Sequence, residues 1–187
     1  MNIVLETERL CLREFATDDA ELLLALDSDP EVMRYINGGK PIDLATIRDQ
    51  TLPAFIDYYH RFAHYGFWAA IERATGQFMG WFHFRPDRED PTEIDLGYRL
   101  MRRYWGRGLV TEGARGLVAQ GFGVWGVERV VGYALEANKA SCRVLEKAGL
   151  KREWEFSYSA AVLPDFAPQD RWAVKYALDR ALYAKKT

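Results

Sequence analysis

Apolar and polar residues alternate along several short segments of the chain, which is the pattern of a half-buried β-strand. In residues 9–15, Leu10 and Leu12 fall on one face and the residues between and beside them on the other. Similar segments predict strands at residues 67–71, 78–84, 93–100, 129–135, 154–162 and 171–178. The pattern therefore predicts a sheet of about seven strands.

Helical segments are predicted between these strands from capping residues. Thr17 or Asp18 begins one that ends before Pro30, and Asp43 begins a longer one that Pro53 kinks or divides. Residues 37–41 are predicted to be a loop because they combine Asn, two Gly and Pro. Hairpins together with one strand–helix–strand crossover predict an α+β fold with a mixed sheet.

A turn rich in Gly and Arg follows the strand at 93–100 and opens a helix that runs toward Val124. It contains Arg103, Gly106, Arg107 and Gly108. Free backbone N–H groups at a helix N-terminus form a seat for a phosphate or pyrophosphate, and glycine allows close approach. The dinucleotide fingerprint fails because Thr111 stands where its third Gly belongs, and no P-loop run is present. An ordinary tight turn is the other interpretation.

A second motif begins at Asn138, which suits a helix N-cap, and ends at Gly149, which suits the residue after a helix. Its residues read Asn-Lys-Ala-Ser and, further along, Leu-Glu-Lys-Ala-Gly-Leu. Capping alone accounts for Asn138 and Gly149. Its spacing from the Gly-rich turn indicates that these residues could also belong to the same binding site as that turn.

The pattern Arg-x-x-Gly-x-Gly at 103–108 resembles the acyl-CoA pyrophosphate loop of the GNAT superfamily of N-acetyltransferases, and the Asn138 motif resembles that superfamily's second motif. Residues 5–13, 18–20, 29–32, 68–71 and 97–98 are similar to its ribosomal-protein-alanine N-acetyltransferase group. The resemblance covers about residues 5–178. It implies a mixed, mostly antiparallel sheet flanked by helices, in which the strand at 129–135 splays from its neighbour to hold acyl-CoA.

The implied reaction is transfer of the acetyl group of acetyl-CoA, a cosubstrate, to a primary amine on a protein N-terminus or a small molecule. A backbone N–H near Leu100 or Met101 would polarise the thioester carbonyl. The expected cosubstrate contacts are Leu100, Met101, Arg103, Trp105, Gly106, Arg107, Gly108, Leu109, Val110, Thr111, Asn138 and Ser141.

Two carboxylates are candidates to accept the proton of the amine. Asp95 is the first choice because it stands where the related family carries its Glu, and Glu93, on the same strand face, is the second. A solvated polar strand face is the competing interpretation. The family's usual proton donor, a Tyr late in the second helix, is replaced by Leu145, so Ser141 is the nearest hydroxyl that could hydrogen-bond the sulfur. Ser141 could equally support only the helix cap.

Other polar and aromatic residues carry weaker expectations. His60 and His64 lack a third ligand, so no metal is expected. Glu112 is expected to complement its helix N-terminus rather than face a phosphate. Four aromatic residues could line the acceptor pocket or belong to the core: Tyr35, Tyr58, Tyr59 and Trp68.

Composition narrows the remaining classes. The chain has 187 residues and a net charge of −2, so we expect one domain, residues 1–187, without nucleic-acid binding. Cys11 and Cys142 suit a reducing cytoplasm, and no segment resembles a signal peptide or membrane span. A non-catalytic acyl-CoA-binding module and a dimeric scaffold remain as alternatives, and a homodimer is possible for the enzyme too.

Overall fold

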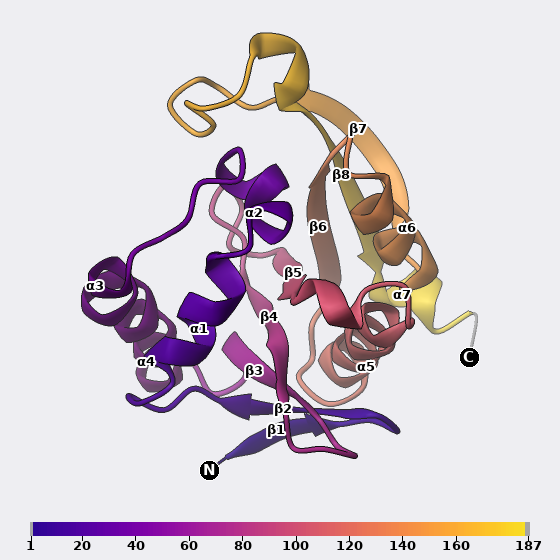
Figure 1. Cartoon of the computed structure of the whole chain (residues 1–187). Coiled ribbons are helices and arrows are strands. Elements are labelled where there is room, and N and C mark those ends of the chain that lie inside the picture. The colour runs from indigo at the N-terminus through magenta and orange to yellow at the C-terminus, as the bar shows by residue number, and fades with distance from the viewer. Residues whose placement is uncertain (1, 186–187) are drawn as a thin grey trace.

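The computed structural model describes residues 2–185, which form one eight-stranded sheet with helices on both faces (Figure 1). The strands are β1 (Ile3–Glu6), β2 (Leu10–Glu14), β3 (Gly66–Glu72), β4 (Phe78–Pro86), β5 (Ile94–Leu100), β6 (Arg129–Leu135), β7 (Lys151–Ser157) and β8 (Trp172–Asp179). Their order is β1-β2-β3-β4-β5-β6-β8-β7, and only β5 and β6 pair in parallel. The mixed, mostly antiparallel α+β fold is therefore confirmed.

Helices cover the two faces in separate groups (Figure 1). One face carries α1 (Ala20–Asp27), α2 (Pro30–Asn37), α3 (Leu44–Thr46), the π-helical turn η1 (Ile47–Thr51) and α4 (Leu52–Arg61). The other carries α5 (Leu109–Gly123) and α6 (Lys139–Lys147). The remaining elements of residues 2–185 are two 3-10 turns, η2 (Arg102–Tyr104) and η3 (Pro168–Arg171), and the short α7 (Arg180–Tyr183). Among residues 2–185, no helix is both long enough and apolar enough to cross a membrane.

Three elements differ from the sequence prediction. The sequence pattern does not predict helix α2, because a Pro commonly marks the end of the preceding helix, whereas Pro30 occupies the first turn of a new helix that Asp29 caps. The eighth strand, β1, is a four-residue edge strand. Strand β7 begins at Lys151 rather than at Trp154, because this exposed edge strand has no apolar face to mark its limits.

The long helical segment after Asp43 is not divided at Pro53 but contains a π-helical turn just before it. The Asp43 side chain accepts a hydrogen bond from the Thr46 N–H, and the segment then continues through the π-helical turn into α4. At that turn the Leu52 N–H bonds to the Ile47 carbonyl, five residues back. Pro53, which follows at once, has no N–H to continue the ordinary helical pattern, and this accounts for the wider turn at this position.

Each face of the sheet has its own core. Phe82 and Phe84 of β4 are fully buried under α5, whereas Trp81 of the same strand packs with Leu23 and Leu26 under the α1–α4 group. Alternation along β4 thus assigns neighbouring residues to opposite cores. Helix α5 approaches the sheet closely because glycines face the two phenylalanine rings: a Cβ at Gly113 would lie 2.5 Å from the Phe82 ring.

We expect Gly113→Ala to lower the free energy of unfolding by about 1–3 kcal/mol, because overpacking against a fully buried ring outweighs the better helix propensity of alanine. Urea denaturation measures the change. Gly123→Ala in the same helix is the matched control, since nothing lies within 4 Å of its added methyl, and it should be neutral or slightly stabilising. Equal stability of the two variants would contradict a rigid contact between α5 and β4.

Candidate functional site

The parallel strands β5 and β6 part soon after they begin. Their only paired positions are Ile94 with Val130 and Asp95 with Val131. Beyond these pairs β5 stays bonded to β4 as far as Leu100, and β6 stays bonded to β8 as far as Leu135. The predicted splay is therefore present, and backbone groups of β5 beyond Asp95 face a gap instead of a neighbouring strand.

A pocket of about 240 Å³ lies along this gap, enclosed by β5, α6, α2 and the Gly-rich turn. Its lining is mainly apolar. Helix α2 contributes Val32 and Tyr35, β5 contributes Tyr98 and Leu100, and α6 contributes Ser141 and Val144. Of the four aromatic candidates, Tyr35 lines this pocket, whereas Trp68 is buried in the core and Tyr59 bonds the Phe67 carbonyl.

The Gly-rich turn has the geometry of an anion seat. Gly106 and Gly108 have φ angles of +72° and +77°, and nothing lies within 4 Å of a Cβ built on Gly106. Among the described residues, the first intrahelical bond of α5 runs from the Glu112 N–H to the Gly108 carbonyl. The N–H groups of Leu109, Val110 and Thr111 therefore have no partner inside the helix and point out of its N-terminus.

Charged side chains beside the turn are largely engaged with each other. Arg107 pairs with Glu72 at 2.8 Å, and Arg103 lies over the Tyr104 ring. Glu112 binds Arg9 at 2.6 Å, as expected for a carboxylate that does not face a phosphate. The backbone N–H groups, more than the guanidinium groups, are thus the free donors of this seat.

Of the two backbone donors predicted to polarise a carbonyl, one is already used. The Met101 N–H donates to the Met79 carbonyl at 2.8 Å. Because N–H groups point alternately to the two sides of a strand, the Leu100 N–H points to the other side, into the gap. Trp105 fixes the adjoining carbonyl, because its indole N–H donates to the Leu100 oxygen at 2.7 Å.

Two hydroxyl groups meet on the wall formed by α6. The Asn138 side chain caps the helix by accepting the Ser141 N–H at 3.2 Å, so its capping role is confirmed. The Tyr98 hydroxyl lies 3.1 Å from Ser141 Oγ and 3.0 Å from the Ser141 carbonyl oxygen. Burial raises the pKa of Tyr98, which keeps the phenol protonated.

Sequence reasoning placed Tyr98 only on an apolar strand face and found no role for its hydroxyl. Helix α6 itself contains no Tyr, and Tyr98 belongs to β5 and reaches the helix across the splay. The detectable signal is its position: alternation places Tyr98 on the same face as Leu96 and Leu100, toward α5 and α6.

Asp95 lies on the opposite face, in a cluster built by strand register. Arg85 of β4 is directly across from Asp95, and His83 is across from Gly97. His83 Nε2 and Arg85 Nη2 lie 3.1 and 2.7 Å from the same carboxylate oxygen, Oδ2. The His83 ring fits because Gly97 has no side chain: a Cβ there would lie 2.4 Å from the ring.

The charge of this cluster favours an ionised Asp95. Burial alone would raise the pKa of Asp95, but the adjacent His83 and the Arg85 guanidinium outweigh it and lower the pKa below its usual value. Its lowered pKa keeps Asp95 ionised at neutral pH, although its side chain is buried and only 6% exposed. His83 and Arg85 were missed in the sequence because their significance depends on the β4–β5 register.

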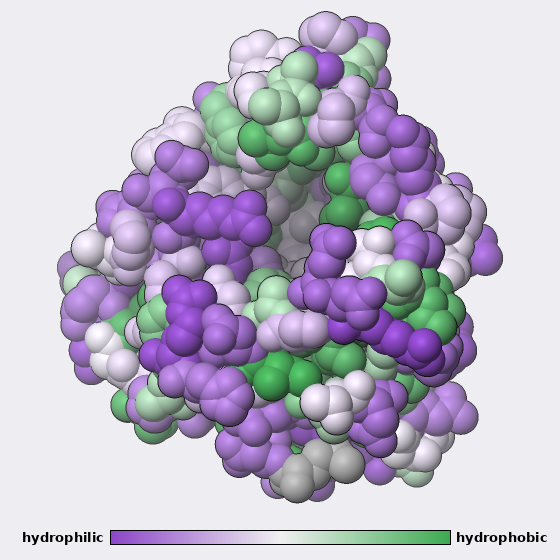
Figure 2. Space-filling model, turned by 90° about the vertical axis from the view of Figure 1, so that its left-hand side faces the viewer, coloured by the Kyte–Doolittle hydropathy of each residue, from purple (hydrophilic) through white to green (hydrophobic). Residues whose placement is uncertain are grey.

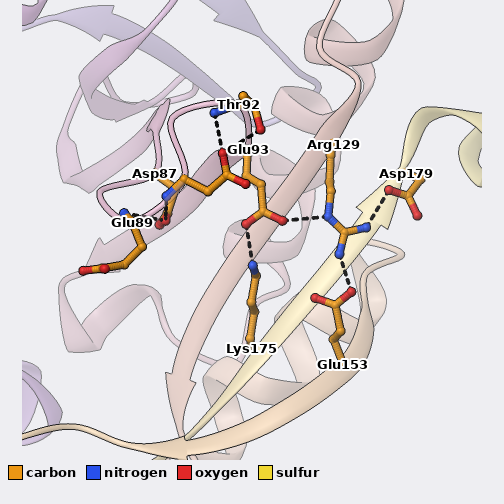
Figure 3. A network of polar contacts seen from close by, with 9 residues as sticks. Asp87, Glu89, Thr92, Glu93, Arg129, Glu153, Lys175 and Asp179 are labelled. Atoms are coloured by element: carbon orange, nitrogen blue, oxygen red, sulfur yellow. Dashed lines mark hydrogen bonds and ion pairs between the residues drawn. The ribbon is translucent and has the colours of Figure 1, made fainter.

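Glu93, the second carboxylate candidate, is held by two cations (Figure 3). Its Oε1 accepts from Arg129 Nε at 2.8 Å, and its Oε2 binds Lys175 Nζ. Arg129 also binds Glu153 and Asp179, and these contacts tie β6 to β7 and β8. Both oxygens of Glu93 are therefore engaged in a network that holds the C-terminal strands together.

Comparison with known proteins gives a consistent result. The chain matches the family model described as an acetyltransferase (GNAT) domain over residues 9–151. It is 34% identical over 151 residues to the uncharacterized protein YkkB of Bacillus subtilis, covering 78% of this chain and 84% of that one. It is 30% identical over 156 residues to FsC-acetyl coenzyme A-N(2)-transacetylase of Aspergillus fumigatus, covering 78% of this chain and 64% of the relative.

A solved structure shares the fold. The ribosomal L7/L12 α-N-protein acetyltransferase RimL, determined in complex with coenzyme A, superimposes with a TM-score of 0.77. The match covers 95% of this chain and 98% of that one at 16% identity, so it supports the arrangement of elements and not the identity of site residues.

The lowered pKa of Asp95 predicts how stability depends on pH. Folding favours the ionised carboxylate, so its stabilising contribution is full above the unfolded pKa of about 3.9 and is lost as pH falls through the lower, folded pKa. Asp95→Asn should therefore destabilise the protein at pH 7, and its deficit should shrink below about pH 4. Urea denaturation of both proteins from pH 7 to 3 measures this difference. A deficit independent of pH would show that the Asp95 charge does not stabilise the fold.

Proposed function

The chain belongs to the GNAT acetyltransferase family, and we propose that it transfers the acetyl group of acetyl-CoA to the nitrogen of a primary amine. The observation that carries this proposal is the splay between β5 and β6, which joins the anion seat of the Gly-rich turn to the Asp95 cluster. A nitrogen acceptor is also supported by two relatives whose names specify one: the N(2)-transacetylase and the α-N-protein acetyltransferase RimL.

The free donors fit the parts of acetyl-CoA. The N–H groups at the start of α5 would bind the pyrophosphate, with Arg103 and Arg107 nearby, and the Leu100 N–H would bind along the pantetheine arm or the thioester. Positive φ at Gly106 and Gly108 lets the phosphates approach the backbone closely. Acetyl-CoA supplies the activated acetyl group, and the apolar wall of Val32 and Val144 excludes water from it.

The chemistry requires one bond exchange and two proton movements. A bond forms between the amine nitrogen and the acetyl carbonyl carbon while the carbon–sulfur bond breaks. The nitrogen loses a proton, and the departing sulfur gains one. In our proposal Asp95 receives the proton directly or through a water that it holds, because its Oδ2 is occupied by His83 and Arg85, whereas among residues 2–185 no hydrogen bond engages its Oδ1. Glu93 is the weaker choice for this step, because both of its oxygens are ion-paired.

The proton for the sulfur is assigned to Ser141, whose hydroxyl passes a proton to the sulfur and regains one from water that enters the pocket. Its Oγ lines the pocket and lies beside the protonated Tyr98 hydroxyl. Tyr98 donates either to the Ser141 carbonyl or to Ser141 Oγ, which leaves the serine hydroxyl hydrogen free to point into the pocket. The pair thereby replaces the tyrosine that the helix lacks at Leu145. Two unpaired thiols, Cys11 and Cys142, suit a reducing cytoplasm as the place of this reaction.

Cosubstrate binding is tested by Gly106→Trp. The indole would fill the anion seat, so acetyl-CoA titrated by calorimetry should bind the unmodified protein with a micromolar Kd and the variant at least about 100-fold more weakly. ATP, which has phosphates but no pantetheine, should bind poorly to both.

Gly126→Trp is the matched control for that substitution. Gly126 has a φ of +70° and, like Gly106, open space around its Cβ, but it lies outside the pocket. Both variants carry similar backbone strain, so a loss of affinity in Gly106→Trp alone locates the cosubstrate. Undiminished affinity in Gly106→Trp would contradict the proposed seat.

The role of Asp95 is tested by separating binding from turnover. Asp95→Asn should bind acetyl-CoA with unchanged affinity but release coenzyme A thiol at least about 100-fold more slowly in the presence of an amine that the unmodified protein acetylates. Asp57→Asn, on the exposed side of α4, is the control. Normal turnover by Asp95→Asn would remove Asp95 from the mechanism.

A further inference from the structure

Aromatic side chains gather on the α1–α4 face at the end of the sheet where the strands part. Leu135, Leu163 and Ala173 are buried together there, and partly buried rings pack around them: Tyr35, Phe156, Tyr158 and Phe166. The Phe156 and Tyr158 rings are 4.9 Å apart, and Tyr133 of β6 lies 6.0 Å from Phe156. We call these five aromatic residues the aromatic cluster. It comes from α2, β6, β7 and the segment 158–171.

The aromatic cluster adjoins two buried carboxylates. Asp95 and Asp87 are each 6% exposed. Tyr133 lies on the same sheet face as Asp95, because it follows Val131, the residue paired with Asp95, by two positions on β6. Burial, together with the negative charges of Asp95 and Asp87, raises the pKa of Tyr158 to about 12. Asp87 Oδ1 accepts the N–H groups of Glu89 and Asp90, and among residues 2–185 Asp87 forms no ion pair. Arg85, by contrast, is already paired with Asp95.

The aromatic cluster is continuous with the cosubstrate pocket. Tyr35 belongs to both, since it packs on the buried residues of the cluster and lines the pocket beside Ser141. Tyr133 follows Val131 by two residues on β6, and Val131 is the last residue paired with β5. On the β5 side, Gly97 carries no side chain two residues beyond Asp95. An amine held at Asp95 thus lies where β5 and β6 begin to part, between Asp95 and the aromatic cluster.

The segment 158–171 limits what can enter. It crosses the top of the molecule in Figure 1 and is tied to the loop after α2 by an ion pair between Asp165 and Lys40. Arg171 fixes it from within by donating to the Leu163 carbonyl at 3.1 Å. Figure 2 shows a hollow below this segment, at the height of α2 and β6. Because this segment is held across the top of the hollow at both Asp165 and Arg171, we infer that it restricts the size of the acceptor.

From this arrangement we propose that the acceptor is a small primary monoamine that carries an aromatic group. Asp95 holds its ammonium group, and the ring packs in the aromatic cluster against Tyr158, Phe156 and Tyr133. A carboxylate beside aromatic rings recognises an ammonium group through charge and through the ring faces, and the rings favour a flat apolar substituent. A polyamine would place its second ammonium group among these apolar rings, and Asp87, whose Oδ1 already accepts two backbone N–H groups, is the carboxylate that it would compete for. The inference rests on the proposed acetyl transfer.

The experiment measures amine binding by calorimetry, with free coenzyme A at saturation and again without it. The probes are 2-phenylethylamine, propylamine, 1,4-diaminobutane and 3-phenylpropionate, which separate the ring, the ammonium group and a second charge. We expect 2-phenylethylamine to bind at least about tenfold more tightly than propylamine and diaminobutane, and 3-phenylpropionate not to bind. A diamine that binds best, or equal affinities of the three amines, would overturn the proposal.

Two variants locate the binding. Tyr158→Ala should weaken 2-phenylethylamine at least about fivefold and leave propylamine unchanged, whereas Asp95→Asn should weaken both. Tyr183→Ala is the matched control, because that ring packs on Phe122 at the opposite face of the sheet. An unchanged preference for the aromatic amine in Tyr158→Ala would also overturn the proposal.

The two proposals fail in different ways. If coenzyme A does not bind, the acetyltransferase proposal fails, while the titrations without coenzyme A still show whether aromatic amines are preferred. If coenzyme A binds and aromatic amines show no preference, only the substrate class is wrong.

Discussion

The parting of β5 from β6 after Asp95 is the constraint on which the site depends. Each interior strand of a sheet normally has a neighbour on both sides, and backbone groups left unpaired must find other partners. Here β4 holds β5 along its whole length and β8 holds β6 along its whole length, so the sheet stays intact while a gap opens inside it. The unpaired backbone groups beside Leu100 can therefore form hydrogen bonds with a ligand without weakening the rest of the sheet.

The two carboxylates at the start of β5 differ in what surrounds them, and this decides their roles. Glu93 has one cation on each oxygen, which suits a residue that joins strands. His83 and Arg85 both contact Oδ2 of Asp95, so they stabilise the ionised carboxylate, whereas Oδ1 forms no hydrogen bond with any residue that the structure describes. Removing a partner from either buried network would leave an uncompensated charge, which makes both positions costly to change.

The sequence predicted what local patterns determine. Strand alternation, the caps at Asp43 and Asn138, the turn around Gly106 and the fold class all follow from residues close together in the chain, and the structure confirms them. His83, Arg85 and the Tyr98 hydroxyl could not be found in this way. Their partners are 10 to 43 residues away, and the register and the crossover that bring them together are set by packing of the whole sheet.

The sheet itself separates the two reactants in this proposal. Tyr98, Leu96 and the helices α5 and α6 lie on one side, and Asp95, His83 and the aromatic cluster lie on the other. Groups bound to opposite faces of a sheet can react only where two neighbouring strands are unpaired and no side chain fills the gap between them. Gly97 meets both conditions: it follows the last pair with β6, and it has no side chain to block the passage. A side chain at this position would displace His83 from Asp95 and fill the gap where β5 and β6 begin to part, so the same glycine serves the proton acceptor and the meeting of the reactants.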